Sequence, residues 1–407
     1  MGKSKNKKNV NVNDMEMGIF KTGFPMLDLL TGRDHIPDIS KPGRYYKIRG
    51  FRSSTMMGIF SESTLGKTTL CLNIGGNIIR RYPYENIQDT IPSLHYYGAE
   101  GGADLARICS TTGIPYGPEA KEYIEIYQRK EATTDQMFKE FKEICEEKEK
   151  NPDKYKGEVR LGNNKSAYRY LPTIFLIDSI SVLAPEQLDD KDKVDNMHAA
   201  TRARINGNYL MKMRKLASKF NIMIFVIQHE TSSIDTNMFA SRKRRGYSRN
   251  VDATGGKKAE FEQDVQLRID KVVAHNRKKT QKKYTNDEDF SSIVRAVVTK
   301  NRFGEANSDM NFYLVQHRLY GFDPLHSYVY DILEKTDIIE HSGGRWFKLR
   351  GRDKKFGKAD IVDLIKKDSK FRTKIREGMN NEYHEFLKYH DTDDILNKQQ
   401  ELLDDML

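Results

Sequence analysis

A lysine and a threonine stand at the end of a short loop whose spacing is typical of phosphate binding. The segment Ser61-Glu62-Ser63-Thr64-Leu65-Gly66-Lys67-Thr68 follows an apolar run at 56–60, and Thr69 continues into a stretch with helical spacing. A loop that delivers the chain onto a helix N-terminus points free backbone N–H groups and the helix dipole at one spot, which suits an anion. Lys67 would add a charge for the β- and γ-phosphates of a nucleotide, and the Thr68 hydroxyl would ligate Mg²⁺.

The loop departs at one position from the usual pattern GxxxxGK[ST], because Ser61 stands where the first glycine is expected. Serine fits there if the backbone avoids positive φ, or tolerates it at a cost. The alternative interpretation is a chance GKT sequence in a basic protein.

Two carboxylates follow two further expected strands. Glu100 ends the segment 94–100, and Asp178 ends the apolar run 172–177. A glutamate beside a phosphate loop is well placed to orient or deprotonate an attacking water, and an aspartate after a buried strand suits Mg²⁺. Taken alone, Glu100 could equally be a surface residue at a helix start, and an apolar run ending in Asp is common.

A long segment from Glu230 to Gly256 shows no pattern of secondary structure. It carries a cluster of basic and aromatic residues. Such side chains suit single-stranded nucleic acid, with charges for the phosphates and rings for stacking. The alternatives are a solvated basic loop or a localisation tract. The cluster comprises Phe239, Arg242, Lys243, Arg244, Arg245, Tyr247 and Arg249.

Lys300 and Arg302 follow an expected strand at 293–298 and would point the same way if that strand continued. They could reach a phosphate, or simply coat the edge of a sheet, and the edge is the more common situation.

Composition limits the class of protein. The 407 residues are 31% charged, with a net charge of +11 and a mean hydropathy of −0.73. No apolar run is long enough for a membrane span, and the basic polar N-terminus lacks the features of a secretory signal. Three scattered cysteines fit a reducing cytoplasm, and the basic balance suggests an anionic partner.

The pattern along the chain predicts four regions: a basic arm at 1–20, a core at 21–325, a C-terminal α-rich region at 326–390 and an acidic tail at 391–407. Strands that alternate with helices predict an α/β core with a mostly parallel sheet. We expect 130–170 to be a solvated helix and loop insertion. Trp346, the only tryptophan, is expected to anchor the core of the C-terminal region, and the acidic tail to compete with nucleic acid or to aid solubility.

The ordered set of these motifs resembles the RecA-type recombinases, from about residue 20 to residue 376. The resemblance rests on the opening segment 22–32, SESTLGKTTL, YYGAEGG, FLIDSISVLAP, LMKMRKLASKFNIMIFVIQH and the sequence Thr254-Gly255-Gly256. It implies a RecA-like P-loop NTPase core that binds ATP and Mg²⁺. It also implies a polymerisation segment within 1–20, in which a short strand around 15–20 would dock on the next subunit.

The resemblance also implies roles for individual residues around the nucleotide. Glu100 would orient the attacking water, and Asp104 and Arg107 would lie at the adenine base. Thr68 and Asp178 would hold Mg²⁺. Either Gln228 or His229 would sense the γ-phosphate. Lys300 and Arg302 would reach the ATP of a neighbouring subunit.

Two DNA-binding loops are implied at 186–204 and 230–254. Arg202 and Arg204 would contact phosphate in the first loop, the basic cluster would do so in the second, and Gly255 and Gly256 would close the second.

The function implied is ATP-dependent strand exchange, in which the protein forms a helical filament on single-stranded DNA and pairs it with homologous duplex DNA. Single-strand-binding and mediator proteins would be partners, and the compartment would be the cytoplasm of a phage-infected bacterium. The sequence leaves two alternatives open: a hexameric helicase that shares Glu100 and Asp178, and a catalytically weak mediator, for which Ser61 is the motivation.

Overall fold

The computed structural model describes residues 18–37, 45–82, 93–101, 103–128, 132–161, 166–186, 196–232, 251–254, 256–272, 290–304 and 310–386. The described residues up to Ser327 form one compact unit, and those from Tyr328 form a second. No helix in these ranges is both long and apolar enough to cross a membrane. The basic cluster at 239–249 and the acidic stretch 391–407 lie outside the described residues, as do residues 1–17 of the basic arm.

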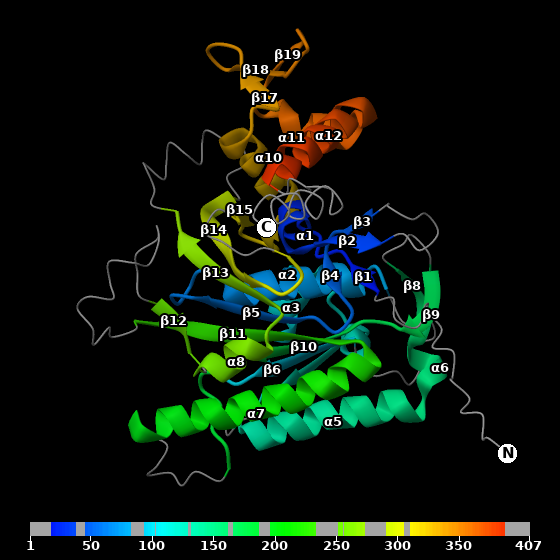
Figure 1. The fold of residues 1–407 in the computed structure, drawn as a ribbon, viewed down its shortest axis with the longest axis vertical. Helices are drawn as coiled ribbons and strands as arrows, with labels where there is room; N and C mark the ends of the chain where they lie inside the picture. The colour runs from blue at the N-terminus through cyan, green and yellow to red at the C-terminus, as the bar shows by residue number, and fades with distance from the viewer. Residues whose placement is uncertain are drawn as a thin grey trace, which may run out of the picture. The chain divides into compact units, whose positions relative to one another are not determined.

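A ten-stranded mixed sheet forms the centre of the first unit (Figure 1). Its parallel part contains, in spatial order, β13 (Val265–Lys271), β5 (Met56–Ser61), β11 (Ile222–Ser232), β10 (Thr173–Asp178), β6 (Leu94–Gly98) and β7 (Ile124–Tyr127). Beyond β13 the antiparallel strands are β14 (Phe290–Asn301), β15 (Asn311–His317) and β16 (Gly321–Asp323). The predicted α/β class with a mostly parallel sheet is confirmed.

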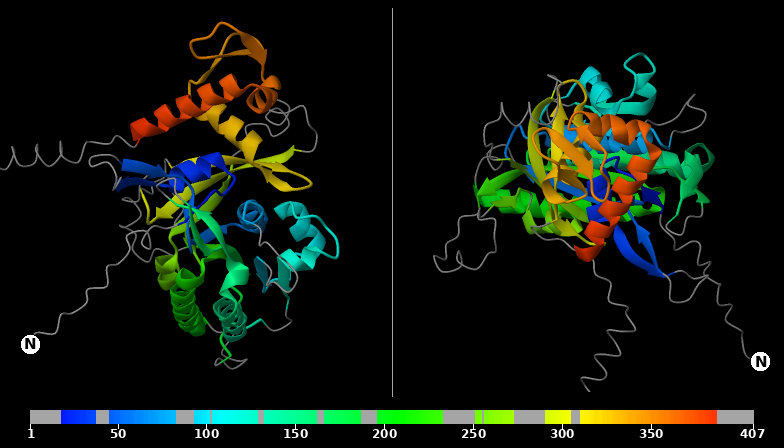
Figure 2. Two further views of the ribbon diagram at one scale, coloured as in Figure 1. Left: turned by 90° about the vertical axis from the view of Figure 1, so that its right-hand side faces the viewer. Right: turned by 90° about the horizontal axis from the view of Figure 1, so that it is seen from above.

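Strands β5 and β10 are buried along their whole length, because helices cover both faces of the sheet. Helix α2 (Lys67–Ile79) packs on one face, where its Gly75 lies against Ile174 of β10, and α3 (Leu105–Thr112) packs beside it. The other face is covered by α5 (Thr134–Lys150), α7 (Asn196–Phe220) and α8 (Gly256–Glu262). Figures 1 and 2 show α5 and α7 side by side on that face.

The helix expected within 130–170 is present, but the expectation that it is solvated was wrong. Helix α5 buries an apolar stripe formed by Met137, Phe141, Ile144 and Cys145 against α7 and the sheet. After α5, the chain forms α6 (Pro152–Tyr155) and a hairpin of β8 (Lys156–Arg160) and β9 (Ser166–Tyr170).

The remaining elements of the first unit lie around this framework. They are β1 (Ile19–Phe20), α1 (Pro25–Thr31), β2 (Arg33–Pro37), β3 (Tyr45–Ile48), β4 (Phe51–Arg52) and α4 (Ala120–Tyr123). The tenth strand of the sheet, β12 (Val251–Ala253), pairs antiparallel with the end of β11. Strand β1 pairs with β4, and Gly18 forms a bridge with Leu161. The segment expected to dock on a neighbouring subunit is therefore paired within its own chain from Gly18 to Phe20.

The second unit contains a small sheet as well as helices. It comprises most of α10 (Pro324–Lys335), strands β17 (Ile339–His341), β18 (Trp346–Leu349) and β19 (Lys355–Gly357), and helices α11 (Asp360–Lys367) and α12 (Ser369–Phe386). Its core includes Phe356, whose ring packs edge-on against Phe371 at 5.4 Å. Trp346 is 42% exposed, so the prediction that it anchors this core was wrong.

Candidate functional site

The loop between β5 and α2 is held in shape by Gly66. Its φ is 88°, in the left-handed region, and a Cβ at this position would lie 2.7 Å from Cζ of Phe322. Glycine is therefore required both by backbone geometry and by the close approach of β16. Helix α2 begins at the next residue, Lys67, and its first N–H groups have no partner within the helix.

The ammonium group of Lys67 folds back over this loop. Nζ donates to the carbonyl oxygens of Ser61 at 3.2 Å and Glu62 at 3.0 Å. Burial lowers the pKa of Lys67, and the nearby carboxylates of Glu100 and Asp178 oppose that effect. A cation tethered to main-chain carbonyls above a helix N-terminus is a suitable partner for a phosphate group.

Ser61 has no need of glycine's conformational freedom. It is the last residue of β5, where it pairs with His229 of β11, and its side chain is buried. Its hydroxyl donates to the carbonyl oxygen of Glu62 at 2.7 Å. Within the loop the positive φ angles fall on Thr64 and Gly66. The departure from the usual loop pattern therefore lies at a position with extended backbone.

Asp178 lies directly opposite the start of α2. Its Oδ2 accepts hydrogen bonds from Thr68 Oγ1 at 2.7 Å and from the Tyr96 hydroxyl at 2.8 Å. Burial raises the pKa of Asp178 in spite of these two bonds. Tyr96 was missed from the sequence, because a tyrosine inside an apolar strand is an ordinary core residue.

Glu100 and His229 face each other at the ends of two strands. The imidazole Nε2 of His229 lies 2.8 Å from Oε1 of Glu100, and Ser179 Oγ donates to the same oxygen. Burial alone would raise the pKa of Glu100, but the hydrogen bonds from Ser179 and His229 outweigh it and lower the pKa. The carboxylate is therefore held in its charged form.

Gln228, the alternative to His229, points elsewhere. Its side chain is fully buried, its Nε2 donates to the carbonyl oxygen of Thr254, and its Oε1 accepts from Gln263 at 2.7 Å. Of the two neighbours, His229 is thus the residue whose side chain reaches Glu100.

Thr254 lies near the end of the segment 230–256, which carries the basic cluster, and it is hydrogen-bonded to His229. Its N–H donates to the carbonyl oxygen of His229 at 2.8 Å, and its Oγ1 accepts from the His229 N–H at 2.9 Å. The pairing of β12 with the end of β11 brings Thr254 there, so the expectation of no secondary structure from Glu230 to Gly256 was wrong at both ends. Gly256 begins α8, and Gly255 lies outside the described residues.

Arg107 reaches the first turn of α2, and Asp104 caps the helix that carries Arg107. Asp104 caps α3 by accepting from the Arg107 N–H at 2.7 Å, and Arg107 Nη2 donates to Thr69 Oγ1 at 3.3 Å.

Lys300 and Arg302 converge on a different point. Both donate to the carbonyl oxygen of Phe261, from Lys300 Nζ at 3.1 Å, and the ring of Phe261 is 64% exposed. They therefore point the same way, as expected, and form a group with Phe261 rather than with Lys67.

Of the predicted DNA-binding residues in the two loops, the structure describes only those of the first loop. Arg202 and Arg204 lie in α7, which begins at Asn196, so their assignment to a loop was wrong. Phe239, Arg242, Lys243, Arg244, Arg245, Tyr247 and Arg249 lie outside the described residues.

Among the described residues no group of three or more histidine, cysteine or carboxylate side chains is arranged to hold a metal. The pair Thr68 and Asp178 still fits Mg²⁺, which commonly takes most of its ligands from phosphate and water oxygens. No protein-family model matches the chain, and no curated protein matches it significantly.

Proposed function

We propose that this chain is an ATP-dependent strand-exchange protein of the RecA type, most similar to the phage recombinase UvsX. It would form helical filaments on single-stranded DNA and pair that DNA with a homologous duplex. The observation that carries the proposal is the grouping of Lys67, Thr68 and Asp178 with the hydrogen-bonded pair Glu100 and His229.

Each member of this group has a role that its contacts support. Lys67 and the N-terminus of α2 bind the β- and γ-phosphates, and Thr68 with Asp178 holds the Mg²⁺ shell. Bound MgATP supplies the phosphoanhydride whose hydrolysis drives the cycle. Glu100, ionised and fixed by Ser179 and His229, orients the attacking water.

The proposed link to DNA runs through His229. The N–H and the carbonyl oxygen of His229 are both hydrogen-bonded to Thr254. Thr254 ends the second of the two segments, 230–254, that would bind single-stranded DNA. A change at the γ-phosphate that moves His229 would therefore pull on that segment. ATP binding would favour the DNA-binding state, and hydrolysis would release it.

The site would be completed by a neighbouring subunit. Lys300 and Arg302 both lie at Phe261, and we assign them to the ATP bound by the adjacent subunit of the filament. Hydrolysis would then require assembly on DNA.

The decisive experiment is ATP hydrolysis with and without single-stranded DNA, measured across protein concentration. The proposal predicts strong stimulation by DNA that rises cooperatively with concentration, because each site needs a neighbour. Stimulation independent of concentration would indicate a preformed ring of the helicase kind. The absence of hydrolysis under every condition would contradict the proposal and favour a mediator role.

A further inference from the structure

The second unit carries an exposed aromatic residue on the outer face of its sheet. Trp346 is the only tryptophan in the chain, and it lies 42% exposed at the start of β18. A Cβ built on its cross-strand partner Gly357 would meet only Asp360, and nothing lies within 4 Å of a Cβ on Gly343 or Gly344. Within its own sheet, the residues next to the ring therefore leave room for a ligand.

Cations surround this ring on the same face. Lys348 follows Trp346 by two residues, so both side chains point outward. Lys355 lies directly opposite Lys348 across β18 and β19. Two like charges at opposed positions are unfavourable unless an anion lies between them. Glu340 of β17 offsets one of them, at 3.2 Å from Lys348.

Arg345 completes the surface by placing its guanidinium group over the indole, 5.5 Å from the ring centroid. An arginine in that position is attracted to the ring and adds a positive charge beside it. We define the Trp346 surface as Arg345, Trp346, Lys348 and Lys355.

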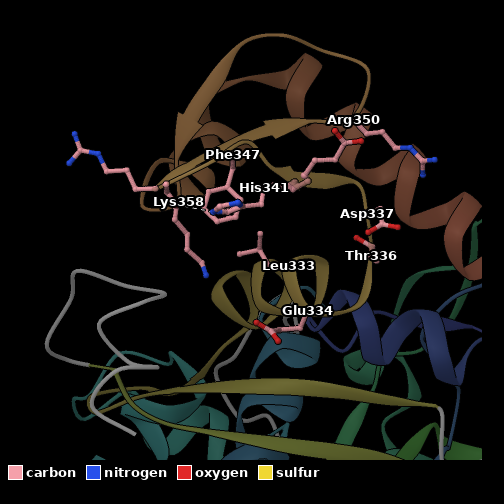
Figure 3. Close-up of a pocket in the computed structure, with 12 residues that line it drawn as sticks. Leu333, Glu334, Thr336, Asp337, His341, Phe347, Arg350 and Lys358 are labelled. Carbon is pink, nitrogen blue, oxygen red and sulfur yellow. Dashed lines mark hydrogen bonds between the residues drawn. The ribbon is translucent and has the colours of Figure 1, made fainter. Parts of the chain in front are cut away.

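The cavity on the other face of this sheet has a different character. It has a volume of about 810 Å³ and is lined by Phe347, which points away from Trp346. Figure 3 shows Phe347, His341 and Lys358 gathered over the end of α10, where Leu333 and Glu334 lie. Its charged lining has both signs and includes Arg345 and Glu340, which also contact Trp346 and Lys348.

We propose that the Trp346 surface is a separate binding site for single-stranded nucleic acid. A base would stack on the indole, and the neighbouring phosphates would lie at Lys348, Lys355 and Arg345. An exposed ring between cations fits an unpaired base better than a duplex, whose base faces are covered by their neighbours. The inference is independent of ATP hydrolysis, because these residues belong to the second unit and Lys67 belongs to the first.

The test uses the intrinsic fluorescence of Trp346 in the full chain, without nucleotide. Titration with a short oligothymidylate should quench the emission saturably, because stacking brings a base against the indole. An abasic oligonucleotide of the same length carries the same phosphates and should not quench. Equal quenching by both would show that charge alone is recognised and would overturn the proposal, as would no quenching by either.

Charge variants locate the signal. Arg345→Ala and Lys348→Ala should each raise the oligonucleotide concentration at half-maximal quenching. Each should also reduce the slope of log K against log salt concentration by about 0.7 per lost phosphate contact. Lys370→Ala, the same charge change on α12, is the matched control and should leave the titration unchanged. An unchanged titration in both Arg345→Ala and Lys348→Ala would show that these cations do not bind the oligonucleotide, and it would overturn the proposal.

Two other occupants give distinct outcomes, and each would overturn the proposal. Stronger quenching by a DNA hairpin than by oligothymidylate would make the site one for duplex DNA. A change in Trp346 emission on removal of residues 391–407, with no further effect of oligonucleotide, would identify the acidic tail as the occupant. Because these readouts do not use ATP, failure here leaves the hydrolysis assay unaffected, and the reverse holds as well.

Discussion

The imidazole Nε2 of His229 lies 2.8 Å from Oε1 of Glu100, whereas the side chain of its neighbour Gln228 points into the interior. Adjacent residues on a strand face opposite sides, so only one of the two can reach the carboxylate. We therefore expect His229 to act in hydrolysis and Gln228 to act in stability.

Substitution of the two residues should therefore give different results. His229→Ala should lower DNA-stimulated hydrolysis on the order of 10²-fold, because Glu100 loses a hydrogen bond that orients it. Gln228→Ala should instead lower the free energy of unfolding by about 1–3 kcal/mol, since Gln263 loses its buried acceptor. Hydrolysis and denaturant unfolding, measured on both variants, check this. The assignment is reversed if Gln228→Ala abolishes hydrolysis in a stable protein while His229→Ala does not.

The loop itself provides a second contrast, between Gly66 and Ser61. Gly66→Ala should cost about 1–3 kcal/mol of stability and weaken ATP binding, because alanine at positive φ is strained and its Cβ meets Phe322. Ser61→Gly should cost only about 0.5–1 kcal/mol, as for glycine in a strand, with hydrolysis close to that of the wild type. Thermal unfolding and nucleotide-binding titrations measure both. A large gain in hydrolysis for Ser61→Gly would show that the serine limits the site.

The sequence predicted those parts of the site that follow from strand ends. Asp178 ends β10, Glu100 follows β6 and Lys67 begins the helix after β5. Parallel strands end at one edge of a sheet, so these residues meet there. The hydroxyls of Tyr96 and Thr254 were missed, because a contact between distant segments has no local signal. Helix α5 was misjudged because its many charges conceal an apolar stripe that recurs at helical spacing. Trp346 was misjudged because tryptophan is usually buried, and the cations around it were not weighed.

Lys148 makes stability depend on pH. Its ammonium group is buried on α5, where Nζ donates to Thr173 Oγ1 at 2.7 Å and to the Leu171 carbonyl oxygen at 3.2 Å. Burial lowers its pKa to about 7. In the unfolded chain the pKa is that of an ordinary lysine, so between these two values the unfolded state binds more protons. Stability should then rise with pH in this window, by up to about 1.4 kcal/mol per unit.

Urea unfolding between neutral and mildly alkaline pH measures this slope. Lys148→Met should flatten it, because the titrating group is gone, while Lys150→Met near the exposed end of α5 should not. An unchanged slope in Lys148→Met would assign the pH dependence to another group.

Lys300 and Arg302 allow a test of whether the site is shared between subunits. Their joint substitution by alanine should leave ATP binding largely intact, because the phosphate loop is untouched, and should suppress DNA-stimulated hydrolysis. Lys67→Ala should do the opposite, weakening ATP binding by roughly 10- to 100-fold through loss of a charged hydrogen bond. Neither variant alone should hydrolyse ATP efficiently.

A mixture of the two variants should recover part of the activity. At some interfaces an intact Lys67 loop would meet intact Lys300 and Arg302 from the neighbour, and these interfaces would hydrolyse ATP. Recovery should peak near equal proportions and require single-stranded DNA, because DNA brings the subunits together. If the mixture stays inactive while the double variant unfolds at a lower denaturant concentration, the two cations serve only to hold the Phe261 carbonyl in their own chain.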